Sequence, residues 1–185
     1  MQIVHFKGLG KMINEDIAFR AITDNDIPFL VEVYASTREE ELQMTDWSDV
    51  EKKAFIDMQF TAQHTQYMAN YKNKEFSIIM YKGDKVGRLY LNRMEDDIRI
   101  VDIAILSKHR GKGIGTPILK NILKEGAQTN RCVTIHVEKY NPAITLYERL
   151  GFKIIADREV YHFMEWKNIA WTKLAPLGWT VFSIS

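Results

Sequence analysis

The chain has a single cysteine, Cys132, among its 185 residues and therefore has no intramolecular disulfide. This usage fits a reducing compartment, and we expect a cytoplasmic protein. The chain also lacks an excess of charge of either sign, because 25 lysines and arginines nearly balance 24 acidic residues. Without a basic excess, the composition does not favour a nucleic-acid-binding protein.

Long apolar runs are absent as well, so we expect no membrane partner. Residues 1–10 lack the apolar core that a secretory signal requires. Internal repeats, low-complexity tracts and clear linkers are missing, which predicts one domain over residues 1–185. No group of His, Cys, Asp and Glu has the spacing of metal ligands, and no metal is expected.

The most informative stretch that is present is the glycine-rich run from Arg110 to Gly115. It follows a strand-like run, residues 98–106, and precedes a helix-like run with apolar residues at Ile114, Ile118, Leu119, Ile122 and Leu123. A strand, a glycine-rich turn and a helix together point several backbone N–H groups at one place. The helix N-terminus adds partial positive charge there, so the pattern predicts a phosphate site.

Two common phosphate loops do not fit the spacing. A P-loop that used Gly111 and Lys112 would need glycine at Leu106 and a hydroxyl residue at Gly113. A dinucleotide fingerprint that used Gly113 and Gly115 would need its third glycine at Ile118. These failures weigh against a protein that binds ATP or NAD.

The spacing Arg-x-x-Gly-x-Gly, formed by Arg110, Gly113 and Gly115, resembles the acetyl-CoA pyrophosphate loop of the GNAT N-acetyltransferase superfamily. A second motif follows a strand-like run, residues 133–137. It contains Asn141, the Leu-Tyr pair that ends at Tyr147, and the pair Gly151-Phe152, and it is similar to the closing segment of the same superfamily. The resemblance covers about residues 17–166.

The patterning itself predicts an α/β domain with a mixed central sheet and helices on both faces. Strands are expected at 17–22, 76–81, 86–91, 98–106, 133–137, 153–158 and 161–166. A helix through Leu30 and Tyr34 and a longer one capped by Ser48 and Glu51 are expected between the first two strands. We expect the apolar face of the longer helix to carry Val50, Phe55, Met58, Ala62 and Met68. The resemblance further implies a mostly antiparallel sheet in which strands 98–106 and 133–137 splay apart to hold CoA.

The resemblance also implies the residues that bind acetyl-CoA. Gly113 and Gly115 let the backbone approach the pyrophosphate. The backbone of Ile103, Ala104 and Ile105 meets the pantetheine arm, and Asn141 bonds to the same region. Amides that face the phosphates are expected from Arg110, Gly111, Lys112, Ile114 and Thr116, with side-chain charge from Arg110 and Lys112.

For catalysis, the motif position makes Tyr147 the expected acid that protonates the departing thiolate. The base is open. Where many relatives carry glutamate this chain has Arg99, and the remaining candidates are Asp102, His136, Glu138 and a water relay.

The expected activity is transfer of an acetyl group from acetyl-CoA to a primary amine by direct attack in a ternary complex. The alternative is a non-catalytic CoA-binding sensor or interaction module. The acidic run Glu39–Glu41 either attracts a cationic amine or is simply solvated. The apolar segment 167–185 is an added strand, a contact in a homodimer or an artefact, and residues 1–11 are an extra β element or an extension.

Overall fold

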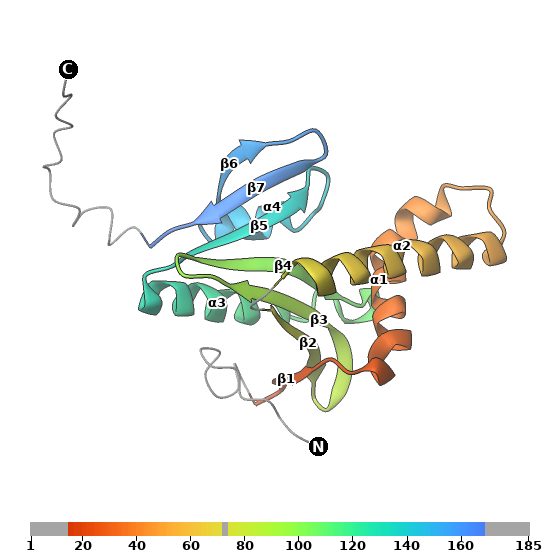
Figure 1. Ribbon diagram of the computed structural model, residues 1–185, viewed down its shortest axis with the longest axis horizontal. Coiled ribbons are helices and arrows are strands. Elements are labelled where there is room, and N and C mark those ends of the chain that lie inside the picture. The colour runs from red at the N-terminus through yellow and green to blue at the C-terminus, as the bar shows by residue number, and fades with distance from the viewer. Residues whose placement is uncertain (1–14, 72–73, 169–185) are drawn as a thin grey trace, which may run out of the picture.

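The computed structural model describes residues 15–71 and 74–168 (Figure 1). These residues form a seven-stranded sheet with the strand order β1-β2-β3-β4-β5-β7-β6. The strands are β1 (Ile17–Ala21), β2 (Lys74–Tyr81), β3 (Asp84–Arg93), β4 (Asp97–Ile105), β5 (Cys132–Glu138), β6 (Lys153–Asp157) and β7 (Tyr161–Trp166). The helices are α1 (Ile27–Gln43), α2 (Asp49–Asn70), α3 (Gly115–Thr129) and α4 (Ile144–Arg149), with 3-10 turns at Asp24–Asp26 and Ser107–His109.

The sheet is mostly antiparallel, as expected. Within the described residues, only β4 and β5 run parallel to each other. Their connection is α3, because parallel neighbours need a crossover rather than a tight turn. The β2–β3 hairpin turns at Lys82 and Gly83, whose φ angles of 53° and 90° belong to a turn that matches the twist of the strands.

Helices cover both faces of the sheet, and each face has its own core (Figure 1). On one face, apolar residues of α3 and Tyr147 of α4 pack with strand residues such as Ile98 and Ile100. On the other face, Leu30 of α1 and Phe60 of α2 pack with residues of β2 and β3. The predicted architecture, a mixed α/β fold with helices on both faces, is confirmed.

The predicted start of α2 is confirmed, but its predicted buried face is wrong. Ser48 and Glu51 form the expected capping box. Val50, Met58 and Met68 are exposed by 78%, 59% and 41%, and the residues that α2 buries are Ile56 and Phe60. Ile56, Phe60 and His64 follow one another at four-residue spacing, and the His64 ring stacks on that of Phe60. This row of side chains forms the face of α2 that packs against the sheet.

The splayed strand pair is present. The pairing of β4 with β5 starts at Asp97 and Cys132 and ends at Ile100 and Ile135. Beyond Ile100, β4 continues to pair with β3 only, after a register shift at Val101 that adds one residue to β4. A bulge of this kind bends a strand and changes the direction of its side chains. The far half of β4 therefore has one edge without a neighbouring strand.

The two ends of the chain, residues 1–11 and most of 167–185, for which the sequence left several roles open, lie outside the described residues. No helix in the described part combines the length and the apolar character needed to cross a bilayer. Residues 15–71 and 74–168 also hold no group of three or more His, Cys, Asp or Glu side chains arranged to bind a metal ion.

Candidate functional site

The gap between β4 and β5 brings the two sequence motifs together. The glycine-rich loop leaves β4 at Ile105 and enters α3, whereas the second motif leaves β5 and enters α4. Ile103, Ala104 and Ile105 lie on the half of β4 that pairs with β3 but not with β5. One row of their backbone groups therefore faces the gap, where an extended ligand can bond to it like an added strand.

The glycine-rich loop has the backbone that its sequence predicts. Gly111 and Gly113 have φ angles of +73° and +75°, and a Cβ at either would meet nothing within 4 Å. These are conformations that favour glycine, with open space next to the chain. Gly115 is different, because it is the first residue of α3 and its φ is not positive. Ile114 and Thr116 flank it at the helix N-terminus, where backbone N–H groups have no helical partner.

Arg110 braces the loop instead of presenting its charge at the phosphate site. Its Nε donates to the carbonyl oxygen of Ile105 at 2.9 Å, and its Nη2 donates to the carbonyl oxygen of Ser36 at 2.9 Å. These bonds tie the loop to β4 and α1. The exposed Lys112 then remains as the side-chain cation between the two positive-φ glycines.

Asn141 caps the turn that precedes α4. Its Oδ1 accepts a hydrogen bond from the backbone N–H of Ala143 at 2.9 Å, and its carbonyl oxygen accepts from the N–H of Ile144 at 3.1 Å. The helix starts at Ile144, two residues after Pro142. Gly151, with a φ of +96°, follows the helix in a conformation that favours glycine.

Tyr147 of α4 is a buried tyrosine. Only 4% of the residue is exposed, and its ring meets Phe152 edge to face with the centroids 5.6 Å apart. Burial raises the pKa of Tyr147 well above its usual value, and the negative charge of Asp102 raises it further. The hydroxyl therefore stays protonated far above neutral pH, and Asp102 lies close enough to influence it.

Asp102 of β4 pairs with a buried arginine that sequence reasoning missed. Nη2 of Arg88 lies 2.7 Å from Oδ2 of Asp102, and 3% of the Arg88 side chain is exposed against 14% of the Asp102 side chain. The same Nη2 donates to Oε1 of Gln63 in α2 at 3.0 Å. We call Arg88 and Asp102 the open pair.

The other base candidates lie in different surroundings. His136 is exposed on β5 and stacks on Phe163 with ring centroids 4.5 Å apart. Partial burial, followed by the charge of Arg99, lowers the pKa of His136, so its imidazole is neutral at pH 7. Glu138 is held in an ion pair with Arg38 of α1 at 3.0 Å, which ties the end of β5 to the opposite helix.

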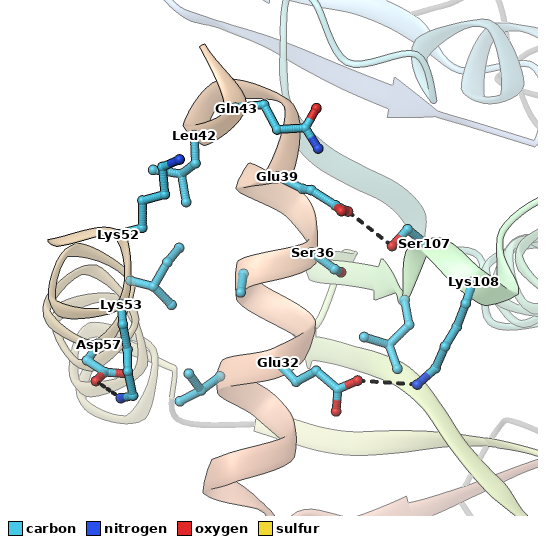
Figure 2. Close-up of a pocket in the computed structure, with 14 residues that line it drawn as sticks. Glu32, Ser36, Glu39, Leu42, Gln43, Lys52, Lys53, Asp57, Ser107 and Lys108 are labelled. Carbon is cyan, nitrogen blue, oxygen red and sulfur yellow. Dashed lines mark hydrogen bonds and ion pairs between the residues drawn. The ribbon is translucent and has the colours of Figure 1, made fainter. Parts of the chain in front are cut away.

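The acidic run Glu39–Glu41 does not form one surface. A cavity of about 560 Å³ lies over the outer side of α1, between α2 and the segment 106–108. Figure 2 shows Glu39 directed at Ser107 in this cavity, with its Oε2 3.3 Å from the Ser107 hydroxyl. Glu41 instead pairs with Arg38 at 2.9 Å. The cavity is therefore separate from Tyr147 and Asp102.

The residues that sequence reasoning missed around the gap are Arg38, Gln63, Tyr67 and Arg88. Arg88 gave no signal because an arginine in a strand is ordinarily exposed. Its burial depends on α2, whose phase the sequence analysis assigned wrongly. Tyr67 of α2 is partly buried against the α1–α2 core, and burial followed by the charge of Asp102 raises its pKa.

Comparisons with known proteins agree with this geometry. Residues 72–154 match the model of the acetyltransferase (GNAT) domain. An N-alpha-acetyltransferase of Sulfurisphaera tokodaii is 32% identical over 81 residues, which are 42% of this chain and 47% of that protein. The match thus spans about half the length of this relative.

Solved structures share the fold over most of the chain. The PaiA N-acetyltransferase of Thermoplasma acidophilum, solved with coenzyme A, has a TM-score of 0.61 at 17% identity and covers 82% of this chain and 99% of its own. A GNAT family acetyltransferase of Elizabethkingia anophelis, solved with acetyl-CoA, has a TM-score of 0.54 at 16% identity. The match covers 84% of this chain and 100% of the Elizabethkingia chain. Residues 72–154, which contain the glycine-rich loop and the splayed β4 and β5, thus match the GNAT acetyltransferase domain in sequence, and the described chain shares the fold of these acetyltransferase structures.

Proposed function

We propose that the protein is an N-acetyltransferase that moves an acetyl group from acetyl-CoA to a primary amine. One observation carries the proposal: the open backbone edge of β4 leads directly into a loop with two positive-φ glycines at the N-terminus of α3. This arrangement offers bonds to an extended arm and, next to it, amides to a diphosphate. Acetyl-CoA is a ligand with both parts in that order.

In this proposal, the loop binds the pyrophosphate through the amides of Arg110, Gly111, Lys112, Ile114 and Thr116. Gly113 leaves room for the ligand, because no atom lies within 4 Å of its Cβ direction. The role of Gly115 is to open α3 without a side chain in the way, and Asn141 contributes from the β5 side. The backbone of Ile103 to Ile105 holds the pantetheine arm, and an N–H of this edge stabilises the developing oxyanion.

Tyr147 is the proposed general acid. Attack of an amine on a thioester expels a thiolate, and a nearby phenol can donate a proton to it. The raised pKa of Tyr147 keeps its hydroxyl protonated at neutral pH, which is the state that a proton donor needs. Burial of the ring against Phe152 holds the hydroxyl in one place.

The amine must lose a proton, and two residues are proposed to receive it. Asp102 lies at the gap on β4 and influences the pKa of Tyr147. His136 lies on β5, and the lowered pKa leaves its imidazole free to accept a proton at pH 7. A pH profile of kcat/KM separates them, because a His136 base gives an acid limb below the usual histidine range, which His136→Gln removes.

Ligand-dependent stability tests the cofactor assignment. Acetyl-CoA at about one hundred times its Kd should stabilise the protein by roughly 2.7 kcal/mol. Gly113→Val should abolish that shift in a folded protein. Gly83→Val is the matched control, because Gly83 also has a positive φ and an open Cβ direction but lies in the β2–β3 turn. If ligand-free wild-type protein shows no shift with CoA or acetyl-CoA, the proposal is wrong.

The acceptor class is a finer part of the proposal. The name of the Sulfurisphaera relative, an N-alpha-acetyltransferase, suggests an α-amine of a polypeptide. Release of free CoA should therefore be measured with a peptide that has a free α-amine, with a lysine side chain in a blocked peptide, and with spermidine. Binding of acetyl-CoA without CoA release for any of them would favour the non-catalytic CoA-binding module.

A further inference from the structure

Arg88 occupies an unusual place for an arginine. It lies in the middle of β3, and 2% of the residue is exposed. Its guanidinium carbon is 5.4 Å from the centre of the Tyr90 ring and 5.9 Å from that of the Tyr34 ring. A buried guanidinium is costly to desolvate and adds little net stability even when it is paired. Net stability alone therefore does not explain why an arginine is buried at this position of β3.

Asp102, the partner of Arg88, has only one of its two carboxylate oxygens in a hydrogen bond within the described part of the chain. Arg88 donates to Oδ2 of Asp102, and within residues 15–71 and 74–168 no hydrogen bond reaches Oδ1 of Asp102. Oδ1 is also absent from the buried side-chain atoms that lack a partner. One oxygen is thus fixed by a rigid donor, while the other remains accessible and accepts a hydrogen bond from whatever enters.

The charge of Asp102 reaches both faces of the sheet. It raises the pKa of Tyr147, which belongs to the α3–α4 face, and of Tyr67, which belongs to the α1–α2 face. In a closed sheet, a strand would separate these faces. Here the pairing of β4 with β5 has ended two residues earlier, at Ile100. Asp102 therefore lies on the part of β4 whose edge, among the residues that the structure describes, has no neighbouring strand on the β5 side.

We propose that Arg88 is a positioning residue for the acceptor: it fixes Oδ2 of Asp102 so that Oδ1 receives an N–H of the incoming amine. This inference rests on the proposed function. Gln63 supports Arg88 from α2, because its Oε1 accepts from the same Nη2. The acceptor side of the gap is then formed by β3, β4 and α2, and the thiol side by Tyr147 of α4.

The pair has a consequence for the acceptor. Arg88 balances the charge of Asp102, so the pair offers a directed hydrogen bond and little net negative charge. The surrounding side chains of Tyr67 and Tyr147 are aromatic. The site therefore fits a single amine next to an uncharged group better than a polyamine, which needs further carboxylates along its length.

Steady-state kinetics with a named acceptor test the proposal. The acceptor is a hexapeptide with a free α-amine and alanine at its first position, compared with spermidine. Arg88→Met should raise the peptide KM about 10–100-fold, the loss of one charge-assisted hydrogen bond. The calorimetric Kd for acetyl-CoA should stay within about twofold. Arg88→Lys should recover part of the peptide KM, because it restores the charge without the rigid fork.

A double-mutant cycle separates positioning from simple folding. Asp102→Asn should raise the peptide KM by itself. Adding Arg88→Met to it should change the KM little further, because Arg88 then has no carboxylate to orient. The double variant removes both charges, so its fold carries no unpaired buried charge. If Arg88→Met alone fails to fold, the comparison of Asp102→Asn with the double variant still tests whether Arg88 acts without its carboxylate.

Two results would overturn the inference. One is a peptide KM that Arg88→Met leaves unchanged in folded protein, and the other is an Arg88→Met effect that persists undiminished in the Asp102→Asn background. Preference of the wild type for spermidine over the peptide would contradict the stated acceptor chemistry. Wild-type protein that binds acetyl-CoA but acetylates nothing would instead contradict the proposed function, so the two failures are distinguishable.

Discussion

The sheet contains two buried clusters of the same chemistry with different geometry. In the open pair, Arg88 holds one oxygen of Asp102 and leaves the other accessible. In the second, which we call the closed cluster (Glu75, Arg93, Glu125 and Arg131), Arg93 grips both oxygens of Glu125 at 2.7 and 2.9 Å. Arg131 adds a bond of 2.9 Å to Glu125, and Glu75 lies 2.5 Å from Arg93.

The difference follows the pairing of β4. The closed cluster lies at the end of β3, where its ion pairs join β3 to the start of β2 and to α3, and join α3 to the turn before β5. The open pair lies where β4 has lost its neighbour β5. A buried carboxylate whose two oxygens are both bonded, such as Glu125, holds a structure together, whereas a carboxylate with one oxygen left free by the described residues, such as Asp102, is available to a ligand. Location in the fold, rather than residue type, separates structural from functional charge.

The largest expected effect is on the open side of the sheet. Tyr147→Phe removes one hydroxyl and keeps the ring that packs on Phe152. Loss of a positioned general acid should lower the single-turnover rate of acetyl transfer about 10²–10⁴-fold. The Kd for acetyl-CoA should be little changed. Tyr71→Phe is the control, because Tyr71 packs against Tyr67 in the α1–α2 core and should transfer normally. A wild-type rate in Tyr147→Phe would remove Tyr147 from the mechanism.

The second largest effect is a loss of stability when the closed cluster is disrupted. Glu125→Gln keeps the shape of a side chain that is 3% exposed but leaves two arginines without their shared carboxylate. The free energy of unfolding should fall by about 3 kcal/mol, which lowers Tm by roughly 6–12 °C. The kinetic constants should stay within about twofold of wild type. A selective loss of catalysis in this variant, with normal stability, would break the distinction between the two clusters.

A smaller effect concerns Asp26, a second fully bonded carboxylate. The hydrogen bond from Arg20, with those from Lys85 and Thr23, holds the pKa of Asp26 far below its usual value despite burial. The folded state thus binds this proton less readily than the unfolded state. The stabilisation is therefore complete above about pH 4 and is lost as the pH falls below it.

Urea unfolding between pH 3 and pH 7 measures that stabilisation. Asp26→Asn should lose about 2 kcal/mol at pH 7 and show a flatter dependence on pH below 4, because the titrating group is gone. Acetyl-CoA affinity at pH 7 should be unchanged. An equally steep loss of stability in wild type and Asp26→Asn would assign the acid sensitivity to other carboxylates.

The smallest effect is expected at the acidic run on α1. Glu39→Gln changes a residue that faces the outer cavity and accepts a single long bond from Ser107 (Figure 2). Stability should change by less than about 0.5 kcal/mol, as for other surface substitutions. The peptide KM should stay within about twofold and should not depend more on salt than in wild type. A large rise in KM would move the acceptor site from the gap to the outer side of α1.

Much of the fold follows from local sequence. The turn at Lys82 and Gly83, the capping box at Ser48 and the glycine-rich loop each depend on residues close together in the chain. The splay of β4 and β5 was expected from the family resemblance, and the end of pairing at Ile100 confirms it. The roles of Tyr147, Asp102 and His136 stay predictions.

The rest depends on contacts between distant segments. Arg88 meets Asp102 and Gln63 only once β3, β4 and α2 are placed, and the phase of α2 was predicted wrongly. Arg110 was expected to face the phosphates, and its bond to the Ser36 carbonyl oxygen requires the position of α1. Sequence patterns identify which residues can carry charge, but the packing of helices on the sheet decides which of those charges is bonded and which is free.

Arg88→Met and Arg93→Met, measured side by side, test the central claim most directly. The two arginines lie five residues apart on β3, and each is paired with a carboxylate, with 3% of the Arg88 side chain and 11% of the Arg93 side chain exposed. Both variants should lose about 3 kcal/mol of stability. Only Arg88→Met should raise the KM for the α-amine peptide, about 10–100-fold. Equal effects of the two substitutions on that KM would contradict the claim that the open pair, and not the closed cluster, holds the acceptor.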